Sequence, residues 1–507
     1  MGNESIARAS PGDEKVGHEM TFLKSILMAG GASLAMAAAA QAADLPTTKG
    51  APAPPPPAKS TSCTGFQDFL TTDCPLTYAG ITLYGTIDIG GGWDKFGAPW
   101  NPTAHFGDNY MISKAGQPNI YELAPNALSQ SNIGVKINEP IVNGWSFVGQ
   151  AETGFDPYSL ELANGQGAQF ENNLVNLPHQ SSSADSSRDG QLLNSQLFIG
   201  VSNSTFGTLT FGRQNSLTLD GVNAYDPMGG SYAFSVIGFS GTTAGVGRTE
   251  DTRSDTAVKY RVTYNNFRAA GLAQIGGWQQ GNGSTQYYQG QVGFDWNGFS
   301  FDAIGSWAED VVNIGTLDTS TSPTQIEPPG TPDFLSGTIS NTASIMLLGK
   351  YTWNQLTLYG GFEDIQYKNP TSNLAAAGGL FTDLAGNTFA SGGNKFFTPE
   401  YFQVYWTGAK YAFTPDLVGT VAYYRYNQDF YQSAAVPIAN CSSTAHSNCS
   451  GYMNAVSGLI DYRFGFAHKF DIYAGAMFSE VDGGLANGYQ NGGHVNIDPT
   501  VGLRLRF

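Results

Sequence analysis

The residues whose types could do chemistry gather in one stretch of the chain, 205–264. Lys259 and Arg261 stand on a strand-like run at its end, and Asp220 and Asp226 stand in the long Gly-, Ser-, Thr- and Asp-rich segment before that run. Fixed cations that face carboxylates across a narrow opening orient dipolar solutes and filter ions. A segment of this length is uncommon inside a compact domain unless it has somewhere to go, such as the lumen of a wide β-barrel. We therefore interpret the stretch as the constriction of a membrane pore.

Residues for catalysis or metal binding are sparse and poorly spaced elsewhere. The histidines after the N-terminal region are isolated in the sequence: His105, His179, His446, His468 and His494. None pairs with another at metal-ligand spacing and no Gly-x-Ser-x-Gly elbow occurs, so we predict no catalytic residues, no protein-bound metal centre and no enzyme activity. Asp- and Asn-rich loops such as 251–255 could hold Ca²⁺ but lack the 12-residue calcium-loop pattern, so a loop-bound calcium ion is the only cofactor left open.

The composition favours a chain that alternates between lipid and water. Only 13% of the residues are charged and 13% are aromatic, with 64 Gly, 25 Tyr and 31 Phe. The formal net charge of −17 makes a nucleic-acid partner improbable. No run of about 18 apolar residues follows the N-terminal region, which argues against a helical membrane span. A closed β-barrel is the other structure that satisfies its backbone inside lipid.

The N-terminal part of the sequence is a processing region. Residues 20–42 combine a charged start, an Ala/Leu/Met run and an Ala-x-Ala end, which is typical of a secretory signal peptide. Residues 1–19 carry four acidic residues that do not fit such a peptide, so we interpret them as an upstream extension and Met20 as the true start. Residues 43–79 are predicted to be a periplasmic segment whose Pro-rich part is a linker, or less favourably a docking site. The barrel is predicted to span 80–507.

Four cysteines remain after the predicted cleavage, in two local pairs. They are Cys63 with Cys74, and Cys441 with Cys449. Export makes disulfides plausible and the short spacings favour local bridges, so we expect two structural disulfides.

Alternating apolar and polar residues predict sixteen antiparallel strands, an even number as in bacterial outer-membrane barrels. In the clearest hairpin, around Asn297-Gly298, Val292 and Phe301 are predicted to face lipid while Gln291 and Asp302 face water. Short turns alternate with long connections, as periplasmic turns alternate with extracellular loops. The predicted strands are 80–90, 130–139, 144–154, 194–203, 206–214, 255–264, 267–277, 286–296, 299–309, 341–353, 356–366, 401–413, 417–428, 452–465, 469–480 and 494–507.

The last strand ends on an aromatic residue, Phe507, after an alternating run in which Arg504 and Arg506 are predicted to face the lumen. A terminal aromatic residue on such a strand resembles the signal that the outer-membrane barrel assembly machinery reads. By alternation alone, further lumen-facing candidates are Lys136, Arg425 and Arg463.

At this point the chain resembles a Gram-negative general porin of the alphaproteobacterial type. The resemblance covers nearly all of the mature chain and rests on Cys63 to Cys74 followed by Leu76-Thr-Tyr, on Ile81-Thr-Leu-Tyr-Gly-Thr-Ile-Asp88, Gly207-Thr-Leu-Thr-Phe-Gly-Arg-Gln214, Tyr225-Asp-Pro-Met-Gly229, Arg253-Ser-Asp-Thr-Ala-Val-Lys-Tyr260 and Phe507. It implies an outer-membrane homotrimer, with lipid and lipopolysaccharide around it, in which the third extracellular loop folds into each lumen.

The resemblance also assigns the constriction. Arg213 and Arg253 match wall arginines, and Asp220 and Asp226 match acidic residues of the inward loop. By strand alternation alone, and not by the resemblance, Lys136, Lys259 and Arg261 join them as lumen-facing cations. Strict alternation would turn Arg213 toward lipid, where an arginine costs about 2–4 kcal/mol, so we expect its strand to end or bulge there.

The expected function is passive diffusion of ions and small hydrophilic solutes through a water-filled pore. Two alternatives stay open. A solute-selective channel would use aromatic lumen residues such as Tyr84 and Tyr359 as a sugar slide. A structural or adhesive barrel would conduct nothing.

Overall fold

The computed structural model describes most of the predicted barrel and part of the region before it. The described residues are 62–72, 74–95, 120–123, 127–155, 157–158, 160, 162, 192–237, 253–275, 286–314, 335–371, 379–382, 388–391, 396–432, 450–464, 469–483 and 495–507. The predicted signal peptide, the Pro-rich segment, Cys441, Cys449 and all five histidines named above lie outside these ranges.

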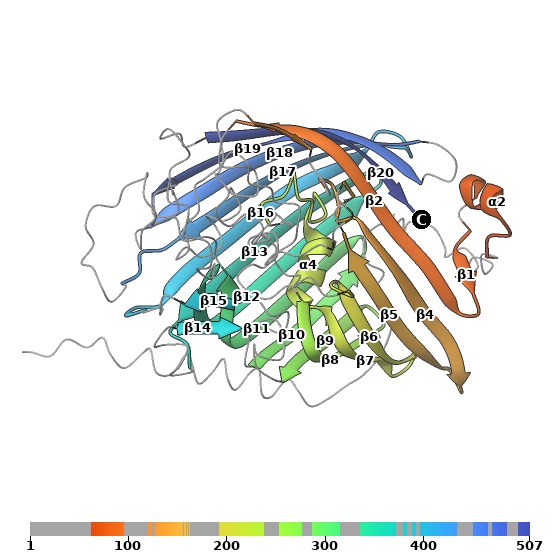
Figure 1. The fold of residues 1–507 in the computed structure, drawn as a ribbon, viewed down its shortest axis with the longest axis horizontal. Helices are drawn as coiled ribbons and strands as arrows, with labels where there is room; N and C mark the ends of the chain where they lie inside the picture. The colour runs from red at the N-terminus through yellow and green to blue at the C-terminus, as the bar shows by residue number, and fades with distance from the viewer. Residues whose placement is uncertain are drawn as a thin grey trace, which may run out of the picture.

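The described strands form one closed antiparallel barrel of sixteen members (Figure 1). In chain order these are β2 (Ile81–Asp94), β4 (Asn132–Val142), β5 (Trp145–Gly154), β6 (Gln196–Asn203), β7 (Gly207–Asn215), β8 (Arg253–Tyr264), β9 (Phe267–Ile275), β10 (Gln286–Trp296), β11 (Phe299–Ile314), β12 (Leu335–Trp353), β13 (Leu356–Lys368), β16 (Glu400–Ala412), β17 (Leu417–Gln428), β18 (Gly451–Phe464), β19 (Phe470–Gly483) and β20 (Val495–Arg506).

The barrel closes where β2 pairs with β20, in a register that joins Thr86 to Arg506 and Gly92 to Thr500. The other edge of β2 pairs with β4. The sixteen-strand prediction is therefore confirmed, and two strands, β10 and β17, begin and end at the predicted residues.

Six smaller elements accompany the barrel in the described part of the chain. They are α2 (Phe66–Thr71), β1 (Leu76–Tyr78), β3 (Ile120–Leu123), α4 (Leu217–Tyr225), β14 (Gly379–Thr382) and β15 (Thr388–Ser391). None of the six was predicted. Among the described residues, no helix has the length and apolar character needed to cross a membrane.

Local sequence explains the short turns. At the β10–β11 turn Asn297 and Gly298 both have positive φ, 46° and 82°, which suits the two-residue hairpin geometry that Asn-Gly favours. Asn143 and Gly144 repeat the pattern between β4 and β5, with φ of 47° and 79°. These turns fix the register of the strands that they join, and the register decides which side chains face outward.

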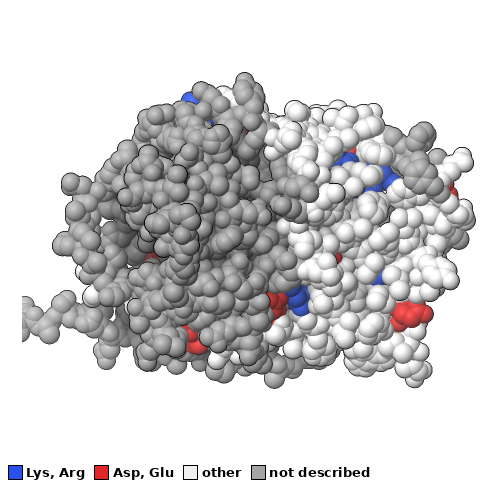
Figure 2. Space-filling model, viewed as in Figure 1, with Lys and Arg blue, Asp and Glu red and all other residues white. Residues whose placement is uncertain are grey.

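The two faces of the wall follow the predicted alternation. On β10 the exposed fraction is 62% for Val292 and 9% for its neighbour Gln291. The polar residue Asp302 of β11 is likewise buried, and the apolar residue Val421 of β17 is likewise exposed. On the face that Figure 2 shows, the described surface is mostly uncharged, with only scattered Lys, Arg, Asp and Glu side chains. The apolar exterior suits lipid and the polar face suits water.

Candidate functional site

The segment after β7 begins with a short helix, α4 (Leu217–Tyr225), which was not predicted from the sequence. Ser216 caps its N-terminus: the Ser216 hydroxyl accepts a hydrogen bond from the backbone N–H of Leu219. Serine is a favoured residue at this position because its side chain satisfies an N–H that the helix leaves unpaired. The Ser-Leu-Thr-Leu-Asp run was the signal in the sequence that could have predicted this helix.

Apolar side chains of α4 are buried against the barrel wall. Leu217 and Val222 have exposed fractions of 0% and 1%. A side chain added at Gly221 would meet Ile304 of β11 and Leu348 of β12. Both are buried, whereas Leu347 on the opposite face of β12 is exposed, so α4 lies against the polar and buried face of the wall. The backbone N–H of Leu217 also donates to the Gln289 side chain of β10 at 2.6 Å.

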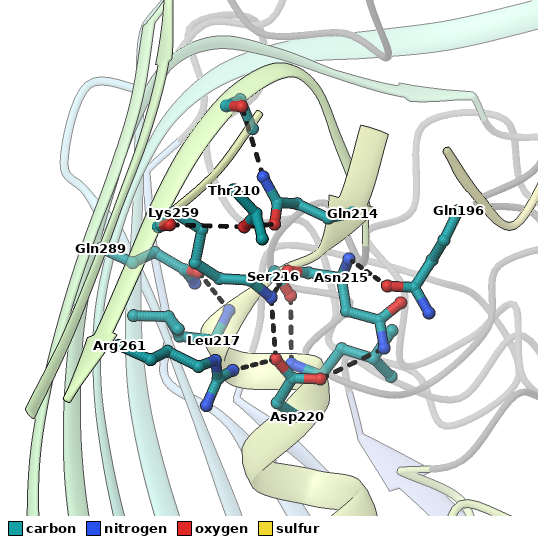
Figure 3. A network of polar contacts seen from close by, with 12 residues as sticks. Gln196, Thr210, Gln214, Asn215, Ser216, Leu217, Asp220, Lys259, Arg261 and Gln289 are labelled. Carbon is teal, nitrogen blue, oxygen red and sulfur yellow. Dashed lines mark hydrogen bonds and ion pairs between the residues drawn. The ribbon is translucent and has the colours of Figure 1, made fainter. Parts of the chain in front are cut away.

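Asp220 joins α4 to two cations of β8 (Figure 3). Its Oδ2 lies 3.0 Å from Lys259 Nζ and also accepts a hydrogen bond from the Arg261 guanidinium. Its other oxygen accepts from the Asn215 amide at 3.1 Å. Burial raises the pKa of Asp220, but the charges of Lys259 and Arg261 outweigh it, so this pKa lies below its ordinary value. The structure thus brings together three of the predicted constriction residues.

Arg213 is turned away from lipid by a bulge, as predicted. The β7–β8 register shifts between Gly212 and Gln214, and Gly212 has a φ of 125° that favours glycine. Arg213 is buried and its guanidinium contacts the Asp255 carboxylate of β8 at 2.6 Å. It also donates twice to the backbone oxygen of Asn194, at 3.0 and 3.1 Å. Its carboxylate partner therefore lies on the wall, not on α4. Arg253 is buried at the start of β8, paired in register with Asn215.

Asp226 follows α4 and holds the chain in a turn. It accepts hydrogen bonds from the backbone N–H groups of Met228 and Gly230, at 3.2 and 2.8 Å, and from the Tyr424 hydroxyl of β17 at 2.6 Å. Burial raises the pKa of Asp226 above its ordinary value. These partners are neutral, and none of them belongs to the Asp220 cluster.

The residues that follow this turn in the chain contact two further strands of the wall, β17 and β19. The Tyr426 hydroxyl of β17 donates to the backbone oxygen of Val236 at 2.7 Å. The rings of Phe234 and Tyr473 of β19 meet edge to face at 6.2 Å between centroids. The backbone N–H of Ala233 donates to Ala127, which lies before β4. Residues 216–237 therefore contact wall elements from β8 to β19.

A second charged cluster, absent from the sequence analysis, lies at the other end of α4. Arg268 of β9 contacts Asp302 of β11 at 2.7 Å and Asp295 of β10 at 2.6 Å. The Tyr225 hydroxyl, on α4, donates to Asp302 at 2.6 Å, and the ammonium of Lys350 lies 5.0 Å from the Tyr225 ring centroid. The alternation of Phe267 and Arg268 at the start of a strand was the signal that could have predicted this cation.

Lys136 lies apart from both clusters, on β4. Its ammonium is 4.3 Å from the ring centroid of Tyr84 on β2. The Tyr84 hydroxyl donates to Glu152 at 2.7 Å and accepts from the Gln150 amide at 2.8 Å. The ring lies against Gly134, where a side chain would come within 2.6 Å of it. Together these residues form a polar group on β2, β4 and β5.

The remaining predicted cations differ in their placement. Arg463 and Arg504 both contact the buried Asp471 of β19, at 3.7 and 2.7 Å, as expected for inward residues. Arg425 was predicted to face the lumen, and this is wrong. It alternates with the buried Tyr424 and Tyr426, and so shares the outward face of β17 with Val421.

The predicted disulfide between Cys63 and Cys74 is present. In the described residues no group of three or more His, Cys, Asp or Glu side chains could hold a metal ion. The calcium-binding loop 251–255 stays a prediction because residues 251 and 252 lie outside the described ranges.

Comparison with known proteins gives one consistent result. A family model described as Gram-negative porin matches residues 29–484. An outer membrane porin protein of Bordetella pertussis is 26% identical over 191 residues, a match that covers 37% of this chain and 40% of the relative.

Solved structures share the fold at low sequence identity. An anion-selective porin from Comamonas acidovorans aligns with a TM-score of 0.52 at 14% identity, over 84% of this chain and 99% of that chain. A loop-deletion mutant of the outer membrane protein OmpT of Vibrio cholerae aligns with a TM-score of 0.50 at 13% identity, over 84% and 99% of the two chains.

Proposed function

Because the chain belongs to the Gram-negative porin family and is a passive diffusion channel of the bacterial outer membrane, we propose that residues 216–237 lie in its lumen as the constriction. The support is the set of contacts that this segment makes. The segment packs on buried wall residues such as Leu348, and the exposed aliphatic side chain of Leu347 stands on the opposite face of the same strand, β12.

The observation that carries the proposal is the bridge from Asp220 on α4 to Lys259 and Arg261 on β8. One carboxylate holds two cations, so the cluster carries a net positive charge while the segment is fixed to the wall. Two ion pairs to one partly buried carboxylate make a rigid rather than a swinging arrangement. Fixed charge at a narrow point filters ions and orients dipolar solutes.

Solutes pass, in this proposal, between α4 and the wall of β2, β4 and β5. The polar side chains recorded there, Tyr84, Gln150 and Glu152, bond to one another. In this proposal they make the lumen-facing side of these strands polar and hydrated, and Lys136 adds a cation to it. The passage is thus bordered by the cations Lys259 and Arg261 on one side and by hydrogen-bonding groups with the opposite charges of Lys136 and Glu152 on the other, which suits small hydrophilic solutes.

The family resemblance supports a homotrimer, surrounded by outer-membrane lipid and lipopolysaccharide and inserted by the barrel assembly machinery through Phe507. The trimer is tested by the native mass of the detergent-extracted protein. The family and the fold point to a channel rather than an enzyme. A sugar slide over Tyr84 is less favoured, because the Lys136 ammonium already lies over that ring.

Cysteine substitution in planar bilayers tests the constriction. The Asp220→Cys channel should lose single-channel conductance when a bulky methanethiosulfonate reagent is added, because the adduct narrows the passage. The control is Glu139→Cys, at an exposed site near the β4–β5 turn, which should react with little effect on conductance. Unchanged conductance of the modified Asp220→Cys channel would place the segment outside the ion path. Persistent absence of conductance in the unmodified protein would favour a structural barrel.

A further inference from the structure

We propose that residues 62–72 and 74–78 form a clasp, closed by a disulfide, that holds shut the seam between the first and last strands of the barrel. The seam is the β2–β20 pairing, and the name seam clasp is used here for residues 62–72 and 74–78. Figure 1 places α2 and β1, the two elements of the clasp, beside the C-terminus.

The seam does not use the whole edge of β2. Its register runs from Thr86 to Gly92, and backbone hydrogen bonds between Gly85 and Phe507, at 2.9 and 3.0 Å, extend it by one residue. Residues 81–83 of β2 lie beyond the end of β20. Unpaired edges of this kind are costly in membrane barrels and are avoided by covering or pairing them.

The strand β1 occupies that free edge. Its residues pair antiparallel with β2, from Tyr78 with Ile81 to Leu76 with Leu83. The opposite edge of the same β2 residues is taken by β4, so β1 and β20 lie one after the other along a single edge. The clasp therefore continues the seam past the point at which the last strand ends.

The helix α2 closes over the end of β20. The ring of Phe69 meets the ring of Phe507 edge to face, at 6.4 Å between centroids. Lys469, directly before β19, places its ammonium 3.6 Å from the Phe69 ring centroid and donates to the Phe69 backbone oxygen at 2.5 Å. The backbone oxygen of Lys469 in turn accepts from Arg506 at 2.8 Å. The Phe69 side chain thus contacts a residue at the end of each of the last two strands, β19 and β20.

The disulfide ties these two contacts together. Cys63 and Cys74 enclose α2, and the backbone N–H of Cys63 donates to Pro75, next to β1, at 3.1 Å. A cross-linked loop cannot extend when one contact breaks, so Phe69 stays close to Phe507 and rebinds. Opening of the seam then requires β1 and α2 to leave together, which lowers the frequency of local opening.

Hydrogen exchange on the folded, detergent-solubilised protein tests the seam clasp. Reduction of the folded chain with dithiothreitol, and separately Phe69→Ala, should each accelerate exchange of the β2 and β20 backbone amides by about tenfold or more. Amides of β10 and β11, on another part of the wall, should keep their rates. Reduction acts after folding, so the test does not depend on whether a variant folds.

Two controls make the result specific. Phe267→Ala removes an exposed phenylalanine beside a different short turn and should leave the seam unchanged. A Cys441→Ser/Cys449→Ser variant should still respond to dithiothreitol. Unchanged seam exchange under either reduction or Phe69→Ala would overturn the proposal, and so would equal acceleration in β10 and β11, which indicates a general loss of stability. None of these readouts depends on conductance.

Discussion

The Asp220 carboxylate of α4 and the Lys259 ammonium of β8 lie 3.0 Å apart, across the boundary between a connecting segment and the barrel wall. Arg261 contacts the same carboxylate from the next inward position of β8. The segment is therefore anchored by charge as well as by the apolar face of α4. Any change at Asp220 alters both the position of the segment and the charge beside the proposed passage.

Asp220→Asn should make the channel more anion-selective. The substitution keeps the size of the side chain and leaves Lys259 and Arg261 without their carboxylate. A unit charge at about 4 Å is worth ~1 kcal/mol even in bulk water. The cation-to-anion permeability ratio, measured from the reversal potential under a salt gradient, should fall by up to about fivefold. Glu139→Gln, at an exposed site near the β4–β5 turn, should leave the ratio unchanged. An unchanged ratio in Asp220→Asn would remove this cluster from the ion path.

Ion selectivity of the wild-type channel should resist acid. The pKa of Asp220 lies below its ordinary value, so the carboxylate stays charged while the pH falls through about 4, where a free aspartate gains its proton. Because the pKa of Asp220 is lower in the folded protein than in the unfolded chain, the ion pairs stabilise the fold fully above about pH 4, the ordinary aspartate pKa. This stabilisation is lost only when the pH falls through the lower pKa of the folded protein. Protonation of Asp220 should therefore not change the reversal potential between pH 7 and about pH 4. A shift that has its midpoint at the ordinary aspartate pKa and that Asp220→Asn abolishes would contradict the assigned pairing.

The sequence was sufficient to predict the strands of the barrel, but it was insufficient to predict the contacts of the candidate site. Period-two alternation and Asn-Gly turns identify strands because every strand repeats the same local pattern, as β10 shows. Arg425 was misplaced because aromatic residues occupy both faces of β17. The alternation of apolar and polar residues therefore does not show which face of this strand is outward. Asp226 matches the position of an acidic loop residue, yet its contacts with Tyr424 and backbone N–H groups depend on a tertiary turn. The Arg268 cluster joins five elements, β9, β10, β11, β12 and α4, and no local pattern brings those together.

Arg213 and Asp255 should show strong coupling in a double-mutant cycle. Both side chains are nearly buried, and removal of either one breaks the ion pair between them. Arg213→Leu and Asp255→Leu should each destabilise the folded barrel by roughly 3 kcal/mol, and the double variant by clearly less than the sum. The free energy of unfolding in urea, from protein folded into lipid vesicles, measures this. Additive effects would show that the contact contributes little. Because Asp255 already neutralises Arg213, we expect Arg213→Gln to change selectivity less than Asp220→Asn does.

The facing of β10 gives a test of the barrel wall itself. Val292 is 62% exposed on the outer face, whereas its neighbour Gln291 is buried and donates to Asp302 at 2.9 Å. Val292→Arg should reduce the stability of the inserted protein by about 2–4 kcal/mol, because the guanidinium then faces lipid. Val292→Leu keeps the apolar surface and should be nearly neutral. Gln291→Arg places its charge beside the Asp302 carboxylate in the wet interior, and should lower the yield of folded protein much less than Val292→Arg. The yield is read from the heat-modifiable shift on gels. Equal losses for the two arginine variants would mean that the outer and inner faces of this strand have been interchanged.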